Sequence, residues 1–143
     1  MGDCSELATY EFTEAHEDGA MGVVDRFAIT IPCEPRAKGR PRVVKGHAYT
    51  PKRTREYETM IAWVLRLAWA ERALMNGPLE VSLGFWLGTR RRVDADNLCK
   101  AVLDAAQGVV FEDDSQIVDL RVTRDVSRDC PRVEIVIERR PEQ

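Results

Sequence analysis

Residues 79–87 of the chain, LEVSLGFWL, place an apolar side chain at every second position from Leu79 to Leu87. Alternation with a period of two is the pattern of a β-strand that buries one of its faces. Asn76-Gly77-Pro78 stands immediately before the run, and such residues interrupt regular structure. The stretch therefore predicts the clearest strand of the chain, and the other elements can be placed outward from it.

The segment that follows this strand predicts a helix over residues 96–107. Gly108 stands where a glycine commonly ends a helix. Apolar residues recur before it at helical spacing: Leu98, Ala101, Val102, Ala105 and Ala106. Asp113-Asp114 then marks a turn, and two further strands are predicted over 117–122 and 133–137.

The segment before residues 79–87 predicts one strand and one long helix. Alternation begins near Arg26 and ends at Ile31, and a helix is predicted from Thr54 to Met75. The basic, Gly- and Pro-containing stretch 36–46 between them predicts a loop or an irregular hairpin. The order of elements predicts a single small mixed α/β domain, with about four strands in a mixed sheet packed against two main helices.

Charge is distributed unevenly along the chain. Residues 1–25 hold seven acidic residues and no Lys or Arg, whereas 26–143 hold 17 acidic and 21 basic residues. We therefore predict an acidic, flexible tail over 1–25 and a folded domain over 26–143. The domain alone is basic, so the net charge of −3 for the whole chain does not exclude a nucleic-acid partner.

Three carboxylates stand out by their position in this pattern. Asp94 and Asp96 lie two residues apart, between the strand predicted over 79–87 and the start of the helix predicted over 96–107. In an extended chain their side chains point the same way. Asp114 follows the helix, where the chain returns toward the sheet. Carboxylates that converge need a cation to neutralise them, and a hard divalent ion such as Mg²⁺ prefers oxygen ligands. The three residues therefore predict a metal site able to activate water.

Two neighbouring polar residues fit the same site. Asn97 is placed to orient a carboxylate, and Lys100 lies one helical turn beyond Asp96, where it can hold a phosphate. Each feature also has a purely structural interpretation. Asp96-Asn97 can be a helix cap, Asp113-Asp114 can be turn chemistry, and Lys100 can be a solvated lysine.

Basic residues flank the candidate site on both sides in the sequence. Such residues hold a polyanionic backbone, while a metal–carboxylate centre cuts it. The candidate DNA-binding residues are Arg36, Lys38, Arg40, Arg42, Lys45, Lys52, Arg53, Arg90, Arg91 and Arg92. A solubilising basic loop is the alternative interpretation.

Several other classes of protein find no support in the sequence. His16 and His47 are the only histidines and lie far apart, and the chain has no Ser/His/Asp arrangement, Walker loop or GxGxxG run. No apolar run approaches the ~20 residues of a membrane span. The N-terminus lacks the pattern of a secretory signal, so the expected location is the cytoplasm.

The motifs together resemble a known family. The runs DADNLCK (94–100), LDA (103–105) and DDSQIVD (113–119) are similar to the signature of the RusA-type Holliday junction resolvases. KGRPR (38–42) and YTP (49–51) resemble a motif of phage and prophage members, and the likeness covers about residues 27–138. The resemblance implies a Mg²⁺- or Mn²⁺-dependent endodeoxyribonuclease of DNA recombination and repair, encoded by a phage or prophage.

The same resemblance implies residue roles and an assembly. Asp94, Asp96 and Asp114 would bind the metal, Lys100 would be catalytic, and Asn97 and Asp113 would be supporting residues. The enzyme would be a homodimer that binds four-way DNA junctions and makes paired nicks in strands of like polarity.

Two other functions are compatible with the residues alone. A non-catalytic DNA-binding module of a recombination or phage complex would use the basic loop, and Asp94 and Asp96 would merely cap a helix. A metal-dependent phosphohydrolase acting on small substrates would need a deep pocket.

Overall fold

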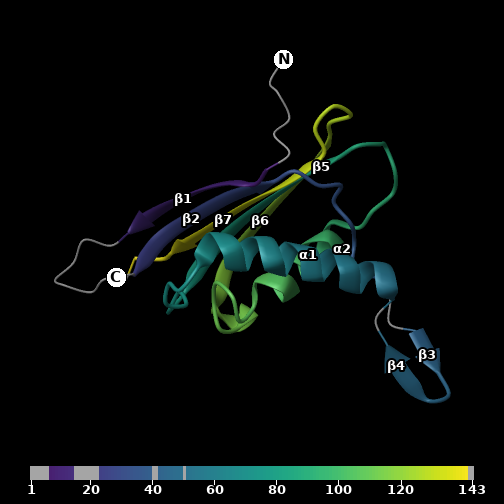
Figure 1. The fold of residues 1–143 in the computed structure, drawn as a ribbon, viewed down its shortest axis with the longest axis horizontal. Coiled ribbons are helices and arrows are strands. Elements are labelled where there is room, and N and C mark those ends of the chain that lie inside the picture. Colours follow the sequence, from purple (N-terminus) through teal and green to yellow (C-terminus); the bar gives the residue numbers. More distant parts are fainter. Residues whose placement is uncertain (1–6, 15–22, 40–41, 50, 142–143) are drawn as a thin grey trace.

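The main sheet has five strands, in the order β1-β2-β7-β5-β6 (Figure 1). The computed structural model describes residues 7–14, 23–39, 42–49 and 51–141. The strands of this sheet are β1 (Thr9–Glu14), β2 (Val24–Ile31), β5 (Leu79–Leu87), β6 (Ile117–Val126) and β7 (Arg132–Arg139). The helices are α1 (Lys52–Trp69) and α2 (Ala95–Ala106), and a short 3-10 turn, η1 (Asp114–Gln116), precedes β6. The predicted mixed α/β domain is thereby confirmed.

Strand β5 lies inside the sheet between β7 and β6, and its alternating residues form the strand that the sequence predicts. It pairs antiparallel with β7 and parallel with β6, and α2 forms the connection between the two parallel strands. Parallel neighbours need such a crossover because a tight turn cannot join them. The β5–α2–β6 unit thus sets α2 across one face of the sheet.

Both helices cover the same face of the sheet (Figure 1). The core lies between the helices and the sheet. It is made of alternate strand side chains, such as Phe27, Leu83 and Ile135, and of one face of each helix. The fully buried helix side chains are, for example, Ile61 and Leu65 of α1 and Leu98 and Val102 of α2. Burying apolar side chains on one face fixes the strand register, because a shift by one residue would expose them.

Helix α1 is shorter than predicted, and part of its apolar surface is exposed. It ends at Trp69, not at Met75, because Ala70 adopts a left-handed backbone (φ 55°) and the Trp69 indole donates to the Arg72 carbonyl (3.0 Å). Met75 instead pairs its N–H with the Val110 carbonyl (2.8 Å). Trp63 of this helix is 58 % exposed, although it is a large apolar side chain. Among the described residues, no helix is long and apolar enough to cross a membrane.

Part of the predicted tail belongs to the sheet. Thr9–Glu14 forms β1, which pairs antiparallel with β2, and the expected boundary at residues 25 and 26 falls inside β2. Phe12 anchors β1, since its ring stacks on Phe27 (centroids 4.9 Å apart) and packs against Trp69 (5.6 Å). The remainder of the predicted tail lies mostly outside the described residues, and its flexibility stays a prediction.

The basic stretch after β2 contains a regular hairpin. Strands β3 (Arg42–Val44) and β4 (His47–Tyr49) pair antiparallel around Lys45 and Gly46, which have φ values of 51° and 79°. Two consecutive positive φ angles are typical of the two-residue turn that matches strand twist. The hairpin projects from the body of the molecule beyond the start of α1 (Figure 1).

Candidate active site

Asp94 and Asp96 lie at the start of α2, and neither side chain is used to cap it. Asp94 occupies the N-cap position and its carbonyl accepts from Leu98 N–H (3.1 Å), but its carboxylate makes no cap hydrogen bond. Among the described residues, the Asn97 amide alone donates to that carboxylate, at 3.4 Å. Asp96 lies in the first helical turn and is exposed. The capping interpretation therefore does not account for these two carboxylates.

Lys100 lies on the exposed face of α2, one turn beyond Asp96. The opposite face of the helix is buried against the sheet through Leu98, Ala101 and Val102. Spacing of four residues places Asp96, Lys100 and Asp104 in a row along the exposed face. Within the described part of the chain, Asp94, Asp96 and Lys100 have no ion-pair partner. Their charges are therefore available to a ligand.

Asp113 and Gln116 hold the turn that carries Asp114. The Asp113 carboxylate accepts from the Ser115 N–H (3.3 Å), and the Gln116 amide oxygen accepts from the Asp113 N–H (3.1 Å). The Gln116 amide also donates to the carbonyls of Met75 (2.9 Å) and Gly77 (3.1 Å), which ties the turn to the start of β5. Turn chemistry thus accounts for Asp113. The sequence prediction missed Gln116, although a capping box is recognisable from its spacing.

The Asp114 carboxylate is exposed and shares a hydrogen bond with its neighbour. That hydrogen bond, together with the charges of Asp113 and Asp104, raises the pKa of Asp114. The Ser115 N–H, followed by the shared hydrogen bond, lowers the pKa of Asp113. A raised carboxyl pKa next to like charges is what a cation would relieve.

The donor atoms suit a hard divalent cation, although the described chain does not gather them into one cluster. No three His, Cys, Asp or Glu side chains among the described residues are close enough together to hold a metal ion. Asp94, Asp96 and Asp114 nevertheless supply exposed carboxylates without a cationic partner in the described ranges, and Mg²⁺ prefers such oxygen ligands. The chemistry of the set fits the ion, and the assignment of its ligands stays a prediction.

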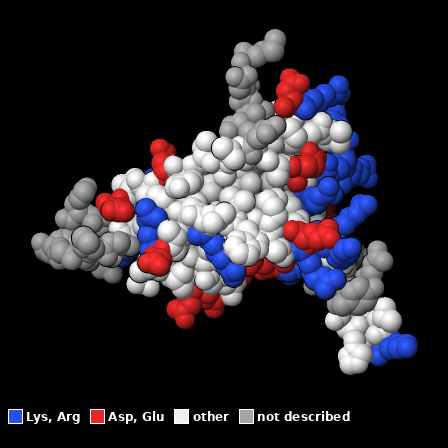
Figure 2. Space-filling view, viewed as in Figure 1, with Lys and Arg blue, Asp and Glu red and all other residues white. Residues whose placement is uncertain are grey.

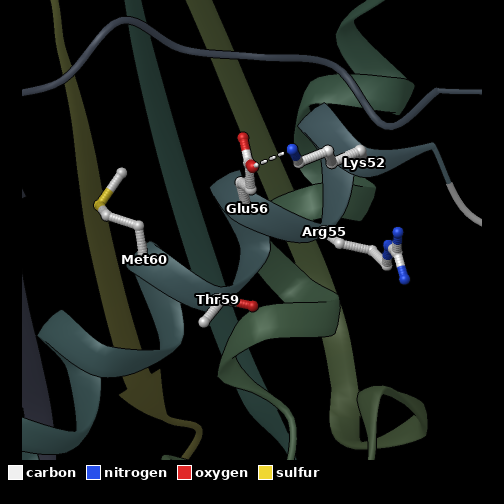
Figure 3. A pocket seen from close by; sticks show the side chains of 5 residues that line it. All are labelled: Lys52, Arg55, Glu56, Thr59 and Met60. Atoms are coloured by element: carbon white, nitrogen blue, oxygen red, sulfur yellow. Dashed lines mark ion pairs between the residues drawn. The ribbon is translucent and has the colours of Figure 1, made fainter.

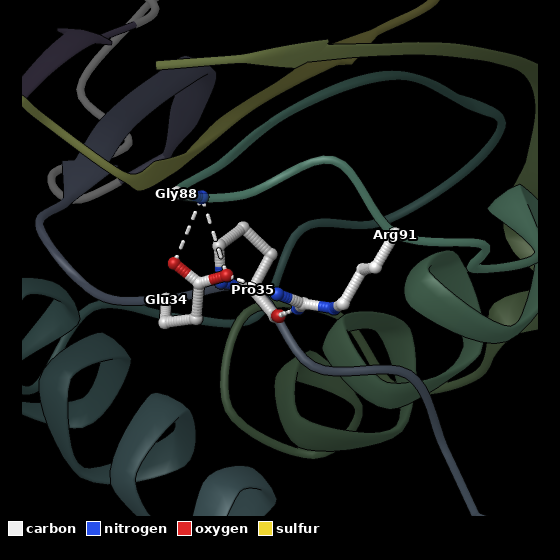
Figure 4. Close-up of polar contacts among 4 residues, drawn as sticks. All are labelled: Glu34, Pro35, Gly88 and Arg91. Carbon is white, nitrogen blue, oxygen red and sulfur yellow. Dashed lines mark hydrogen bonds and ion pairs between the residues drawn. The ribbon is translucent and has the colours of Figure 1, made fainter. Parts of the chain in front are cut away.

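Glu34 joins the loop after β2 to the loop that leads to Asp94 (Figure 4). Its carboxylate accepts from the Gly88 N–H (3.0 Å) and pairs with the Arg91 guanidinium, which also donates to the Pro35 carbonyl. A Cβ at position 88 would lie 2.7 Å from the Glu34 carboxylate, so a side chain there would force that carboxylate to shift. The guanidinium of Arg91, a residue predicted to bind DNA, is therefore engaged by an ion pair and a hydrogen bond within the chain, although the side chain is 35 % exposed.

Lys38 makes the corresponding link between the two helices. Its ammonium pairs with Asp104 of α2 and with Glu58 of α1, the latter at 3.4 Å, and its backbone N–H donates to the Asn97 carbonyl (3.0 Å). The hydrogen bond to Asp104 is the main cause that raises the pKa of Lys38. Lys38 thus positions the start of α2, a role that the sequence prediction did not assign.

The remaining predicted DNA-binding residues are more exposed. Figure 2 shows Lys and Arg side chains gathered on the side of the molecule where the loop after β5 and the start of α1 lie. The exposed members are Arg36, Lys45, Lys52, Arg53, Arg90 and Arg92. Arg40 lies outside the described residues, and only the backbone of Arg42 is described.

The surface hollows near α1 do not contain the candidate carboxylates. One, of about 560 Å³, is lined by Lys52, Arg55, Glu56, Thr59 and Met60 (Figure 3), and its only carboxylate pairs with Lys52 at 3.8 Å. A second, of about 470 Å³, is lined by Cys33, Glu34, Arg36, Arg53, Glu56, Tyr57 and Met60. Asp94, Asp96 and Lys100 stand instead on an open surface, which suits an extended substrate better than a small one.

Comparison with known proteins places these features in a family context. The model of the family described as Endodeoxyribonuclease RusA matches residues 32–138. The crossover junction endodeoxyribonuclease RusA of Escherichia coli (strain K12) is 29 % identical over 115 residues, covering 80 % of this chain and 95 % of that protein. The protein of that name from Enterobacteria phage 82 is 28 % identical with the same coverage. The uncharacterised protein YqaN of Bacillus subtilis (strain 168) is 28 % identical over 139 residues, covering 80 % and 96 %.

Proposed function

The chain belongs to the RusA family of endodeoxyribonucleases, and from this we propose that it resolves four-way (Holliday) DNA junctions by paired nicks. The observation that carries the proposal is made at the start of α2. The carboxylates of Asp94 and Asp96 are exposed there, are not used to cap the helix and have no cationic partner in the described chain. Lys100 lies one helical turn beyond Asp96. The phage relative supports a phage or prophage origin and a role in DNA recombination and repair. DNA as the substrate also supports the predicted cytoplasmic location.

We assign the chemistry to this chain's residues as follows. Asp94, Asp96 and Asp114 would hold Mg²⁺, with Mn²⁺ as a substitute; when bound, the ion supplies an activated water and neutralises charge. Lys100 holds a non-bridging oxygen of the cut phosphodiester and offsets the charge that develops on it. Arg90 and Arg92 hold the neighbouring backbone phosphates.

The assembly that two cuts require is a homodimer. Each chain carries one set of these residues and therefore one cutting site, and a four-way junction has two strands to be cut. Twofold symmetry is the commonest arrangement of two identical chains, and it would present two equivalent sites.

Cleavage of a labelled four-way junction, compared with linear duplex, tests this function directly. We expect paired nicks on the junction in millimolar Mg²⁺ or Mn²⁺ and none when the cation is chelated. Binding of the junction without any cutting in either cation would instead favour the non-catalytic DNA-binding module.

The two neighbouring arginines, Arg90 and Arg91, are expected to behave differently when each is replaced by methionine. Arg90 is exposed and has no partner among the described residues, so Arg90→Met should remove one phosphate contact and reduce the salt dependence of DNA binding by about one unit of slope. Arg91 pairs with Glu34, so Arg91→Met should lower the thermal midpoint and leave the slope unchanged. Fluorescence anisotropy over a salt series and thermal unfolding measure the two effects. Equal slopes for both variants would contradict the assigned roles.

A further inference from the structure

Strand β6 forms one edge of the main sheet and leaves its outer side open. It pairs with β5 only, and no other described strand lies beyond it. Its ten residues make a long edge, and two of its apolar side chains are exposed, Val118 by 50 % and Leu120 by 43 %. Proteins usually cover or charge such an edge, because it offers free backbone groups to another strand.

The side chains of β6 divide into two kinds on its two faces. Leu120 and Val122 stand opposite the buried Val81 and Leu83 of β5, so they belong to the face that the helices cover. Asp119 and Arg121 stand opposite Glu80 and Ser82 and belong to the other face. The middle of the edge, residues 119–122, therefore has the apolar Leu120 and Val122 on one face and one charge of each sign on the other.

Residues 119–122 are complementary to themselves in the antiparallel register centred on Leu120. A register centred on Thr123 would also oppose Arg121 to Asp125, but it would set Arg124 opposite the apolar Val122. When two copies of β6 pair, opposed residues must share a face, and the registers centred on Asp119, Leu120 and Arg121 all meet this condition. Centring on Asp119 opposes two aspartates, and centring on Arg121 opposes two arginines; like charges in opposed positions destabilise a sheet. Centring on Leu120 places each Asp119 opposite the Arg121 of the other copy and brings the two Leu120 side chains together on one face.

We propose that β6 is the interface between two copies of this chain, paired antiparallel with Leu120 on the twofold axis. The inference rests on the homodimer of the proposed function and names the surface that forms it. Joining edge to edge makes the two sheets continuous, so the helices of both copies cover the same face. Asp94, Asp96 and Lys100 of each copy, which α2 carries, then lie on the same side of the dimer, as two nicks in one junction require.

Charge reversal on the edge tests the interface. Asp119→Arg and Arg121→Asp each oppose like charges twice across the axis, so each variant alone should dimerise with a Kd at least about tenfold above that of the wild type. An equimolar mixture should recover the wild-type Kd, because one chain then carries two positive charges and the other two negative charges. Sedimentation equilibrium measures these constants without DNA and without cutting.

The mixture separates an interface effect from a folding effect. Asp119 and Arg121 form an exposed ion pair within one chain (3.8 Å, with the Arg121 side chain 79 % exposed), and mixing cannot restore a pair inside a chain. Glu11→Arg on β1, the opposite edge of the sheet, breaks a comparable exposed pair with Arg26 and should leave the Kd unchanged. Dimers that withstand both reversals would overturn this interface and keep the homodimer, whereas a wild-type monomer at every concentration would overturn both.

Discussion

Asp96→Asn is expected to lower the rate of junction cutting by about a thousandfold or more while the junction stays bound. Loss of one carboxylate from a three-carboxylate metal site removes several kcal/mol of stabilisation from the reaction, and each 1.4 kcal/mol changes the rate about tenfold. Binding should be equal to the wild type or tighter, because one negative charge that faces the DNA backbone is removed. Single-turnover cutting and anisotropy on the same junction measure the two quantities.

The fold should not change in this variant, which makes the result interpretable. Asp96 is exposed, and no ion pair or cap within the described chain depends on its carboxylate. Asp129→Asn provides a matched control, since Asp129 is also an exposed aspartate but lies in the loop between β6 and β7. It should cut at the wild-type rate. Near wild-type cutting by Asp96→Asn would remove Asp96 from the site and leave it a surface residue of α2.

The elements whose side chains alternate between buried and exposed were predictable from the sequence. The alternation of 79–87 reappears as β5, and the helical spacing of apolar residues over 96–107 reappears as α2 within one residue at each end. These signals are local, since the spacing of apolar residues within an element indicates which of its faces is buried. They were enough to predict the mixed sheet and both helices.

The elements that depend on distant partners were predicted less well. Residues 9–14 became a strand because Phe12 packs on Phe27 and Trp69, contacts that local composition does not reveal beside so many acidic residues. The early end of α1 has a similar cause, since the Met75 N–H donates to the carbonyl of Val110, which follows β5 and α2 in the sequence. In both places tertiary contacts outweighed the local pattern.

The candidate site shows the same division. The sequence was enough to predict that Asp94, Asp96 and Lys100 lie close together at the start of a helix, because a strand, a loop and that helix follow one another there. The partners of the basic residues were not, because Arg91 and Glu34 are 57 residues apart and Lys38 and Asp104 are 66 apart. A count of Lys and Arg near the acids therefore overestimates the cations that are free to bind DNA.

Lys38→Met is expected to lower the free energy of unfolding by about 2 kcal/mol. The substitution keeps a long apolar side chain but leaves the carboxylates of Asp104 and Glu58 without their cation. The Glu58 Oε1 atom that Lys38 approaches at 3.4 Å is buried and accepts no hydrogen bond from the described residues. Breaking a fully buried pair costs about 3–5 kcal/mol, and the Lys38 side chain is 22 % exposed, so solvent reduces the loss. In a domain of this size the thermal midpoint should fall by about 6 °C.

The pH dependence of this stabilisation follows from the raised pKa of Lys38. A lysine whose pKa is higher in the folded chain stabilises it fully below the ordinary lysine pKa of about 10.4, and the contribution is lost as the pH rises through the raised value. The difference in unfolding free energy between wild type and Lys38→Met should therefore be constant from neutral pH to about pH 10 and shrink above it. Lys52→Met is the matched control, because Lys52 is 83 % exposed and its pair with Glu56 spans 3.8 Å. It should cost less than about 0.5 kcal/mol at every pH. Equal losses from the two substitutions would show that Lys38 does not hold α2 against α1.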